Sequence, residues 1–169
     1  MKLGRYEVIK ELGQGGMATA FLALAPGGQK VVLKTPHLKS DDLNDRLRDE
    51  ARIGIRLAHP ALVETLDLFE HNGKPVLVVA FIDGMSVDAL RRHAPLPGAA
   101  VARIGWQIAQ GLHAVHCATD ERGRPLHMVH RDVTAPNALV DKSGDARLID
   151  LGIARSVENL AATEPGTIK

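Results

Sequence analysis

Three side chains near the C-terminal end of the sequence have the types and the spacing that metal-assisted phosphoryl transfer requires. Asp132 and Asn137 fall within the segment HRDVTAPN at residues 130–137, and Asp150 follows in the stretch RLIDLG. A carboxylate can accept the proton of a hydroxyl nucleophile, while an amide and a second carboxylate offer the oxygen ligands that Mg²⁺ prefers. The set therefore indicates a site built for phosphoryl-transfer chemistry.

The residues upstream of this set predict a glycine-rich hairpin followed by a strand that ends in a lysine. Residues 12–24 read LGQGGMATAFLAL, and VVLK at 31–34 follows a turn at Gly27 and Gly28. A dinucleotide-binding fingerprint would open a helix directly after its glycines, whereas the residues that follow here are β-prone. The arrangement favours a flap over nucleotide phosphates, formed around Gly13, Gln14, Gly15 and Gly16.

A helix is predicted after the lysine strand, and one carboxylate projects from its apolar face. Ser40 is a candidate N-cap, and residues typical of a buried face then recur at helical spacing at Leu43, Leu47, Ala51 and Gly54. Glu50 lies three residues after Leu47 and four before Gly54, which places it on that face. A carboxylate there needs a partner, and Lys34 is the candidate.

The remaining periodicity predicts further strands and a second helix. Strands are expected in the region 61–82, including an apolar strand at 75–84. From Pro97 a helix carries one apolar stripe, made by Val101, Ile104, Ile108, Leu112 and Val115. Short strands are expected at 128–129, 138–140 and 147–149, and the turn at 142–145 makes the last two a hairpin.

Taken in order, the glycine flap, Lys34, Glu50 and the HRD and DLG segments resemble the motifs of a protein kinase. The stretches GGMATAFLA and DERGRPLHMVHRD, with Val133 and Thr134 in the loop, are similar to bacterial Ser/Thr kinases of the Hanks type. The resemblance implies an α+β, protein-kinase-like fold. It implies a complete N-terminal lobe, an antiparallel sheet with one helix, at 1–82. The hinge and the beginning of a helical C-terminal lobe would occupy 83–169, with the boundary within 82–86.

The resemblance also implies a reaction and the residues that perform it. A protein Ser/Thr kinase transfers the γ-phosphoryl group of ATP, bound with Mg²⁺, to a hydroxyl of a protein substrate. By resemblance, Asp132, Lys34, Glu50 and Arg131 are catalytic, and Asn137 and Asp150 hold Mg²⁺. ATP would be bound by Leu12, Gly13, Gln14, Gly15, Gly16, Ala20, Val32, Lys34, Val79, Ala80, Ile82 and Leu139, and the backbone of Ala80 and Ile82 would contact the adenine.

Several positions depart from the family pattern. Ala18 replaces the third glycine of the flap, and Leu151 replaces the usual phenylalanine with another apolar residue. Gly54 stands where the family packs a larger apolar side chain. Thr134 stands where most Ser/Thr kinases carry a lysine that reaches the γ-phosphate. We expect the loss of this charge to slow transfer unless another cation substitutes.

The C-terminal segment contributes two further expectations. The sequence reaches Lys169 without an A-P-E motif, which predicts a fragment of a longer kinase or a truncated relative. For residues 1–169 alone we expect doubtful activity and Mg²⁺-ATP binding that is weak or absent. Thr163 is a candidate phosphorylation site whose phosphate would pair with Arg131, and Ser156 or Thr167 are alternatives. The Gly166–Thr167 pair favours Ser/Thr over Tyr specificity.

Composition excludes several other classes. Lys and Arg total 21 against 20 Asp and Glu, and the charges are interspersed, so no broad field attracts nucleic acid. The longest apolar run, 76–82, is far below the roughly 20 residues needed to span a bilayer, and no signal peptide is present. With a lone Cys117 and no sign of export, we expect a cytoplasmic protein. The histidines near Cys117 fit no ordinary zinc spacing, and we expect Trp106 to serve packing.

Two alternatives to a protein kinase remain open. A truncated nucleotide-binding or regulatory module without transfer activity would explain the missing motifs, although the intact Lys34, Glu50, Asp132 and Asp150 argue against decay. A small-molecule kinase of the same fold, such as an antibiotic phosphotransferase, is the other. The glycine flap, Arg131 and the Gly166–Thr167 pair count against it.

Overall fold

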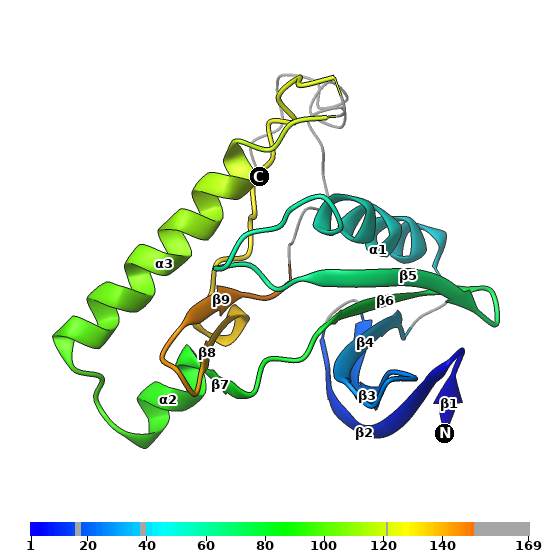
Figure 1. Cartoon of the computed structure of the whole chain (residues 1–169), viewed down its shortest axis with the longest axis horizontal. Helices are drawn as coiled ribbons and strands as arrows, with labels where there is room; N and C mark the ends of the chain where they lie inside the picture. The colour runs from blue at the N-terminus through cyan, green and yellow to red at the C-terminus, as the bar shows by residue number, and fades with distance from the viewer. Residues whose placement is uncertain (16–17, 38–39, 121, 151–169) are drawn as a thin grey trace, which may run out of the picture.

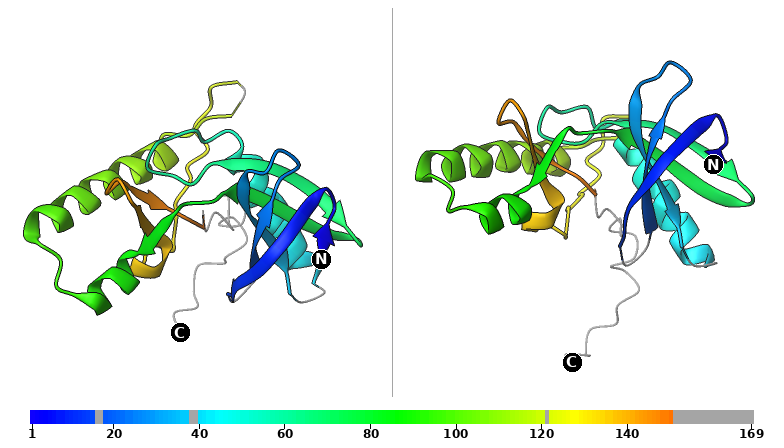
Figure 2. Two further views of the ribbon diagram at one scale, coloured as in Figure 1. Left: turned by 60° about the horizontal axis from the view of Figure 1, so that its bottom comes forward. Right: turned by 90° about the horizontal axis from the view of Figure 1, so that it is seen from below.

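The computed structural model describes residues 1–15, 18–37, 40–120 and 122–150. These residues form two lobes, a larger sheet with one helix and a smaller sheet with two helices (Figure 1). The turned views in Figure 2 show the helix α3 and the small sheet on one side and the large sheet with α1 on the other. The predicted α+β architecture is thus observed.

The large sheet is antiparallel throughout, with the strand order β1-β2-β3-β4-β6-β5. Tight turns make this pairing possible. Asn72 and Gly73 both have positive φ, 52° and 72°, as a two-residue hairpin between β5 and β6 requires. The strands are β1 (Lys2–Leu3), β2 (Tyr6–Gln14), β3 (Ala18–Leu24), β4 (Lys30–Pro36), β5 (Thr65–His71) and β6 (Lys74–Ala80).

The helix α1 (Asp41–Gly54) covers one face of this sheet, as its predicted apolar stripe requires. Successive residues of β6 point to opposite faces, so Leu77 and Val79 join Leu47 and Ala51 of α1 in one buried cluster. A second cluster on the other face contains Tyr6, Ala23, Val31, Leu33, Val76 and Val78. Ser40 occupies the N-cap position as predicted, but its side chain makes no capping hydrogen bond.

The second lobe is built on a three-stranded antiparallel sheet with the order β7-β8-β9. Its elements are β7 (Gly84–Ser86), α2 (Val87–His93), α3 (Gly98–His116), a short 3-10 helix η1 (Ala135–Asn137), β8 (Ala138–Asp141) and β9 (Ala146–Leu148). Ile108 and Val115 of α3 pack against Met128 and Leu148 in the core of this lobe. Gln107 ties α3 to the β8–β9 hairpin, because its Oε1 accepts from the Ala146 N–H at 2.9 Å.

Several sequence expectations need correction. Residues 128–129 form no strand, and Val129 is exposed. The apolar strand expected at 75–84 ends at Ala80, because the chain turns there toward the second lobe. Trp106 was expected to serve packing, but it is 61% exposed on α3. Among the helices of the described residues, none is long and apolar enough to cross a membrane.

Candidate active site

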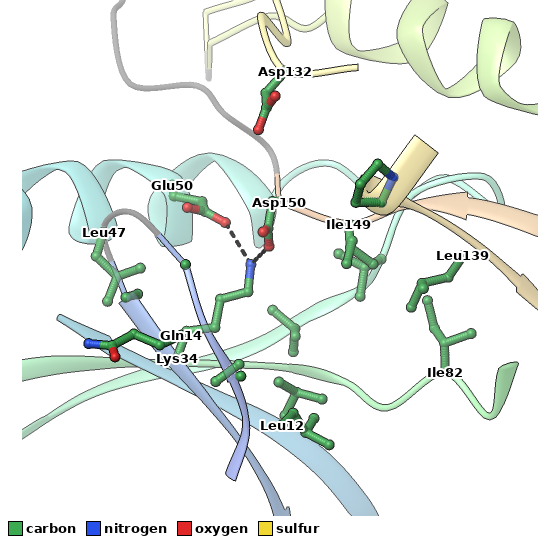
Figure 3. Close-up of a pocket in the computed structure, with 18 of the residues that line it drawn as sticks. Leu12, Gln14, Lys34, Leu47, Glu50, Ile82, Asp132, Leu139, Ile149 and Asp150 are labelled. Carbon is green, nitrogen blue, oxygen red and sulfur yellow. Dashed lines mark hydrogen bonds and ion pairs between the residues drawn. The ribbon is translucent and has the colours of Figure 1, made fainter. Parts of the chain in front are cut away.

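A cavity of about 860 Å³ opens between the two lobes and collects most of the predicted site (Figure 3). Ile82 and Leu139 lie together at one end, while Gln14 and Leu47 lie at the other. Every described member of the predicted ATP-binding set lines this cavity: Leu12, Gly13, Gln14, Gly15, Ala20, Val32, Lys34, Val79, Ala80, Ile82 and Leu139. Gly16 lies outside the described residues.

Lys34 lies between two carboxylates in the middle of the cavity. Its Nζ is 3.3 Å from Oε1 of Glu50 and also contacts Oδ1 of Asp150. The register of the sheet places it there, because Lys34 on β4 pairs with Ala20 on one side and Leu77 on the other. Glu50 comes from the buried face of α1. The sequence prediction that Glu50 partners Lys34 is confirmed, and the contact with Asp150 is added by the structure.

Burial and charge compete in this trio. Burial acts to lower the pKa of Lys34, but the charges of Glu50 and Asp150 outweigh it, so the pKa of Lys34 is raised. For Glu50, burial raises the pKa, and the opposite charge of Lys34 offsets only part of the rise. The single ammonium of Lys34 is thus shared by two carboxylates.

In the loop at 130–137, Asp132 is held by Asn137. The Asn137 Nδ2 donates to the carboxylate Oδ2 of Asp132 at 2.7 Å and to its backbone carbonyl at 3.2 Å. The backbone at Arg131 is left-handed, with φ 62°, which bends the loop at this point. Beneath the loop, His130 is buried, and its Nδ1 accepts from the Asp132 N–H at 3.4 Å. Burial lowers the pKa of His130, which favours its neutral form.

Asp150 is placed by hydrogen bonds that cross between the lobes. The Leu148 N–H donates to the Ala61 carbonyl, and the Leu148 carbonyl accepts from the Val63 N–H, both at 2.9 Å. The Ile149 N–H donates to the Asn137 carbonyl at 2.9 Å. The segment 61–63 and η1 thus fix the two residues that precede Asp150. Asp150 itself has φ 59°, a left-handed conformation that Asp tolerates better than most residues.

The remaining predicted residues are placed as follows. Asp132, Glu50 and Asp150 line the cavity, whereas Arg131 and Asn137 do not. The Ala80 N–H donates to the Glu64 carbonyl at 2.9 Å, so it is not offered to a ligand. Thr134 is exposed, and its carbonyl accepts from the Asn137 N–H. Thr163, Leu151 and the Gly166–Thr167 pair lie outside the described residues.

Sequence reasoning missed part of the lining. Arg46 is a second cation on the wall, one helical turn before Glu50, and its Nε is 3.0 Å from Oδ2 of Asp42. Helical spacing from Glu50 could have identified Arg46, and adjacency to Asp150 could have identified Ile149. The other missed lining residues are Ala18, Pro36, Leu43, Leu47, Val63, Phe81, Gly84 and Pro136.

The fold and the site together define a two-lobed protein whose interlobe cleft carries a lysine, two nearby carboxylates and a loop aspartate. A sequence model of the protein kinase domain matches residues 6–168, and the chain belongs to the protein kinase family. The predicted protein-kinase-like fold is therefore confirmed. The relatives described next are bacterial, as the sequence indicated.

Two relatives come from Myxococcus xanthus. Tyrosine-protein kinase MasK is 34% identical over 180 residues, which cover 98% of this chain and 28% of MasK. Serine/threonine-protein kinase pkn2 is 34% identical over 175 residues, which cover 98% of this chain and 20% of pkn2. The crystal structure of the Mycobacterium tuberculosis PknI kinase domain matches with a TM-score of 0.71 and 28% identity, covering 90% of this chain and 60% of that chain. The chain thus spans a minor part of these curated relatives.

Proposed function

We propose that this chain forms the nucleotide cleft and catalytic loop of an ATP-dependent protein kinase that phosphorylates serine or threonine hydroxyls. The observation that carries the proposal is the convergence of Lys34, Glu50, Asp150 and Asp132 on one cavity between the lobes. Membership in the kinase family supports the reaction class. We place the reaction in the cytoplasm, where ATP is available.

The cavity suits ATP in both shape and chemistry. Its Ile82–Leu139 end is apolar, as an adenine ring requires, and the Ala80 carbonyl and the Ile82 backbone are the proposed adenine contacts. Lys34 would hold the phosphates beneath the glycine flap, and its contact with Glu50 directs it there. The buried carboxylate therefore acts on the nucleotide through Lys34.

The donors at Asn137 and Asp150 fit Mg²⁺. Asn137 uses its Nδ2 to bind Asp132, which leaves its amide oxygen for a cation. An amide oxygen and a carboxylate are hard oxygen ligands, and Mg²⁺ commonly takes one or two such groups with phosphate oxygens and water. When bound, the ion would neutralise charge on the transferring phosphoryl group. Lys34 contacts Asp150 in this structure, so Asp150 would have to bind Lys34 and the metal ion together.

Asp132 is the proposed base or orienter of the acceptor hydroxyl. It faces the cavity, and Asn137 fixes its carboxylate at 2.7 Å. A carboxylate held in this way can orient a hydroxyl and take its proton as the phosphoryl group moves.

Substitution of Asp132 tests the proposal in the full-length protein. Asp132→Asn keeps the shape and the hydrogen bond from Asn137, so we expect ATP affinity to change little while kcat falls about 10²- to 10⁴-fold. Phosphate transfer from labelled ATP should be measured with Ser/Thr and Tyr protein substrates. Asp49→Asn, on the exposed face of α1, is the matched control and should remain active. Full turnover in Asp132→Asn would contradict the assignment, and transfer only to Tyr would correct the substrate class.

Thr134 favours a second candidate function, a nucleotide-binding regulatory module without transfer activity. Within the described lining, the cations are Lys34 and Arg46, and neither belongs to the catalytic loop. This alternative predicts saturable ATP binding with no phosphate transfer in the wild type. The same binding and transfer assays therefore separate the two candidates.

We also propose Thr163 as a site of activating phosphorylation. The support is Arg131, which directly precedes Asp132 and could pair with a phosphate. Phosphopeptide mapping after incubation with ATP should find the modification at Thr163 rather than at Ser156 or Thr167.

A further inference from the structure

Helix α1 approaches strand β5 so closely at Gly54 that no side chain fits between them. A Cβ added to Gly54 would lie 2.2 Å from Oγ1 of Thr65 and 3.0 Å from its Cβ, where ordinary contact begins at 3.4 Å. Gly54 is buried and its φ is not positive, so its backbone conformation does not require glycine. Gly54 is the last residue of α1, and its close approach to Thr65 accounts for a glycine at this position.

Thr65 is held from several sides and cannot easily withdraw. It begins β5 and pairs with Val79, which lines the nucleotide cavity, and an irregularity in the register follows between Thr65 and Asp67. The preceding residue, Glu64, accepts from the Ala80 N–H, and Val63 donates to the Leu148 carbonyl. A side chain added at Gly54 can turn the Thr65 hydroxyl aside, but it would still meet the Thr65 Cβ, and because the strand is anchored the remaining displacement falls on α1.

Displacement of α1 would act directly on Glu50. Gly54 lies four residues after Glu50, so the two share one face of the helix. The Lys34–Glu50 separation of 3.3 Å is already near the upper limit for a hydrogen bond, and an outward shift of about 1 Å would break it. The contact at Gly54 thus determines how closely Glu50 approaches Lys34.

We infer that the Gly54–Thr65 contact is a positioning device that seats α1 and so holds Glu50 on Lys34. Thr65 fills the space in which the resemblance to protein kinases predicts a larger side chain at position 54. The role of the contact in catalysis rests on the proposed kinase function, whereas its effect on the ion pair does not.

A functional test in the full-length protein compares Gly54→Ala with two double variants. Gly54→Ala should lower both kcat and ATP affinity at least 10-fold, well below the unfolding temperature. Adding Thr65→Gly removes the obstructing side chain and should restore both to within about threefold. Adding Thr65→Ala, which leaves the close Cβ, should give intermediate values. Gly27→Ala is the matched control, since its Cβ would meet nothing within 4 Å. Unchanged kinetics in Gly54→Ala, or no rescue by Thr65→Gly, would overturn the inference.

An unfolding cycle tests the contact even if the protein transfers no phosphate. Lys34→Met removes the ion pair, so its effect on the unfolding temperature measures how well that pair is formed. If Gly54 seats Glu50, Lys34→Met should lower the unfolding temperature by less than half as much in a Gly54→Ala background as in the wild type. Equal shifts in both backgrounds would show that the contact does not position Glu50. A wild type inactive in every transfer assay would refute the kinase proposal while leaving this cycle decisive.

Discussion

Lys34 is the residue on which the electrostatics of the cleft depend. The Lys34 side chain is 11% exposed and forms ion pairs with Glu50 and Asp150. The side chain of Glu50 is 22% exposed. Without Lys34, the buried carboxylate of Glu50 would lose its counter-charge in a poorly solvated position. Leaving a buried charge without its partner strongly destabilises the folded state of a protein.

Lys34→Met should destabilise the protein in a pH-dependent way. Removing one partner of a fully buried pair costs about 3–5 kcal/mol, and the partial exposure of Glu50 reduces the expected loss to about 1–3 kcal/mol at pH 7. The pKa of Glu50 is already raised by burial and would rise further. The folded variant would then hold its proton more tightly than the unfolded chain, so stability falls as pH rises through the carboxylate range. Chemical denaturation at pH 4 and pH 7 should show the deficit shrinking at the lower pH.

Thr134→Lys should accelerate phosphate transfer. The substitution adds a cation to the catalytic loop, two residues after Asp132, where charge develops on the transferring group. Thr134 is exposed, and its structural contact is made by its backbone, so the loop should tolerate the change. We expect kcat to rise roughly 10-fold, the scale of about 1.4 kcal/mol, with a smaller change in KM. A Thr134→Met variant controls for side-chain length. Equal rates for the Lys and Met variants would mean that another cation already stabilises the charge on the transferring group.

At the scale of elements, the β8–β9 hairpin positions both Asn137 and Asp150. Asp141 at the end of β8 organises its turn. Its carboxylate accepts from the Ser143 hydroxyl at 2.5 Å, from the Asp145 N–H at 3.0 Å and from Arg147 at 2.7 Å. These donors, the Ser143 hydroxyl foremost, hold the pKa of Asp141 well below its ordinary value.

Asp141→Asn should loosen the hairpin at neutral pH and progressively less as the pH falls below about 4. We expect a loss of about 1–2 kcal/mol at pH 7, because hydrogen bonds to a charged acceptor are replaced by weaker ones. A carboxylate with a lowered pKa stabilises the fold fully above its ordinary pKa of about 4, and this contribution is lost progressively as the pH falls from there toward the much lower pKa of the folded state. The difference in unfolding free energy between variant and wild type should therefore begin to narrow below about pH 4 and should keep narrowing at still lower pH. A gap of constant size would assign the loss to packing instead.

At the scale of the whole molecule, α3 leaves two large apolar side chains in solvent. Trp106 is 61% exposed, and Val101, near the start of the helix, is 52% exposed, whereas Ile108 and Val115 of the same helix lie in the core of the second lobe. The chain covers 60% of the PknI kinase domain chain that it matches. These two side chains add to the hydrophobic surface that the described residues present to solvent.

Trp106 gives a direct measure of this surface, because it is the single tryptophan of the chain. In residues 1–169 we expect red-shifted emission that a neutral quencher reduces almost as efficiently as it does in the unfolded chain. Trp106→Gln should leave the unfolding temperature nearly unchanged, whereas Ile108→Ala, in the core, should lower it markedly. Blue-shifted, protected emission from residues 1–169 would show that this face is covered.

The sequence by itself determined the elements that depend on near neighbours. The β-prone flanks of the flap, the helical stripe through Leu47 and Ala51, and the turn at 142–145 all reported local structure correctly. Helical spacing also placed Glu50 on a buried face of its helix. Because a carboxylate there needs a partner, Lys34 could be predicted as that partner. Periodicity succeeds in these cases because it records which side of an element avoids water.

Only the tertiary structure decided which remote elements meet. Lys34 and Asp150 are 116 residues apart, and their contact depends on the hydrogen bonds of Leu148 to the segment 61–63. The local sequence pattern does not predict that Thr65 contacts Gly54, or that Trp106 on α3 is exposed to solvent. A periodic pattern shows that a face is apolar but not what covers it. That choice is made by long-range packing, which in this chain also places Glu50, Lys34 and Asp150 around one cavity.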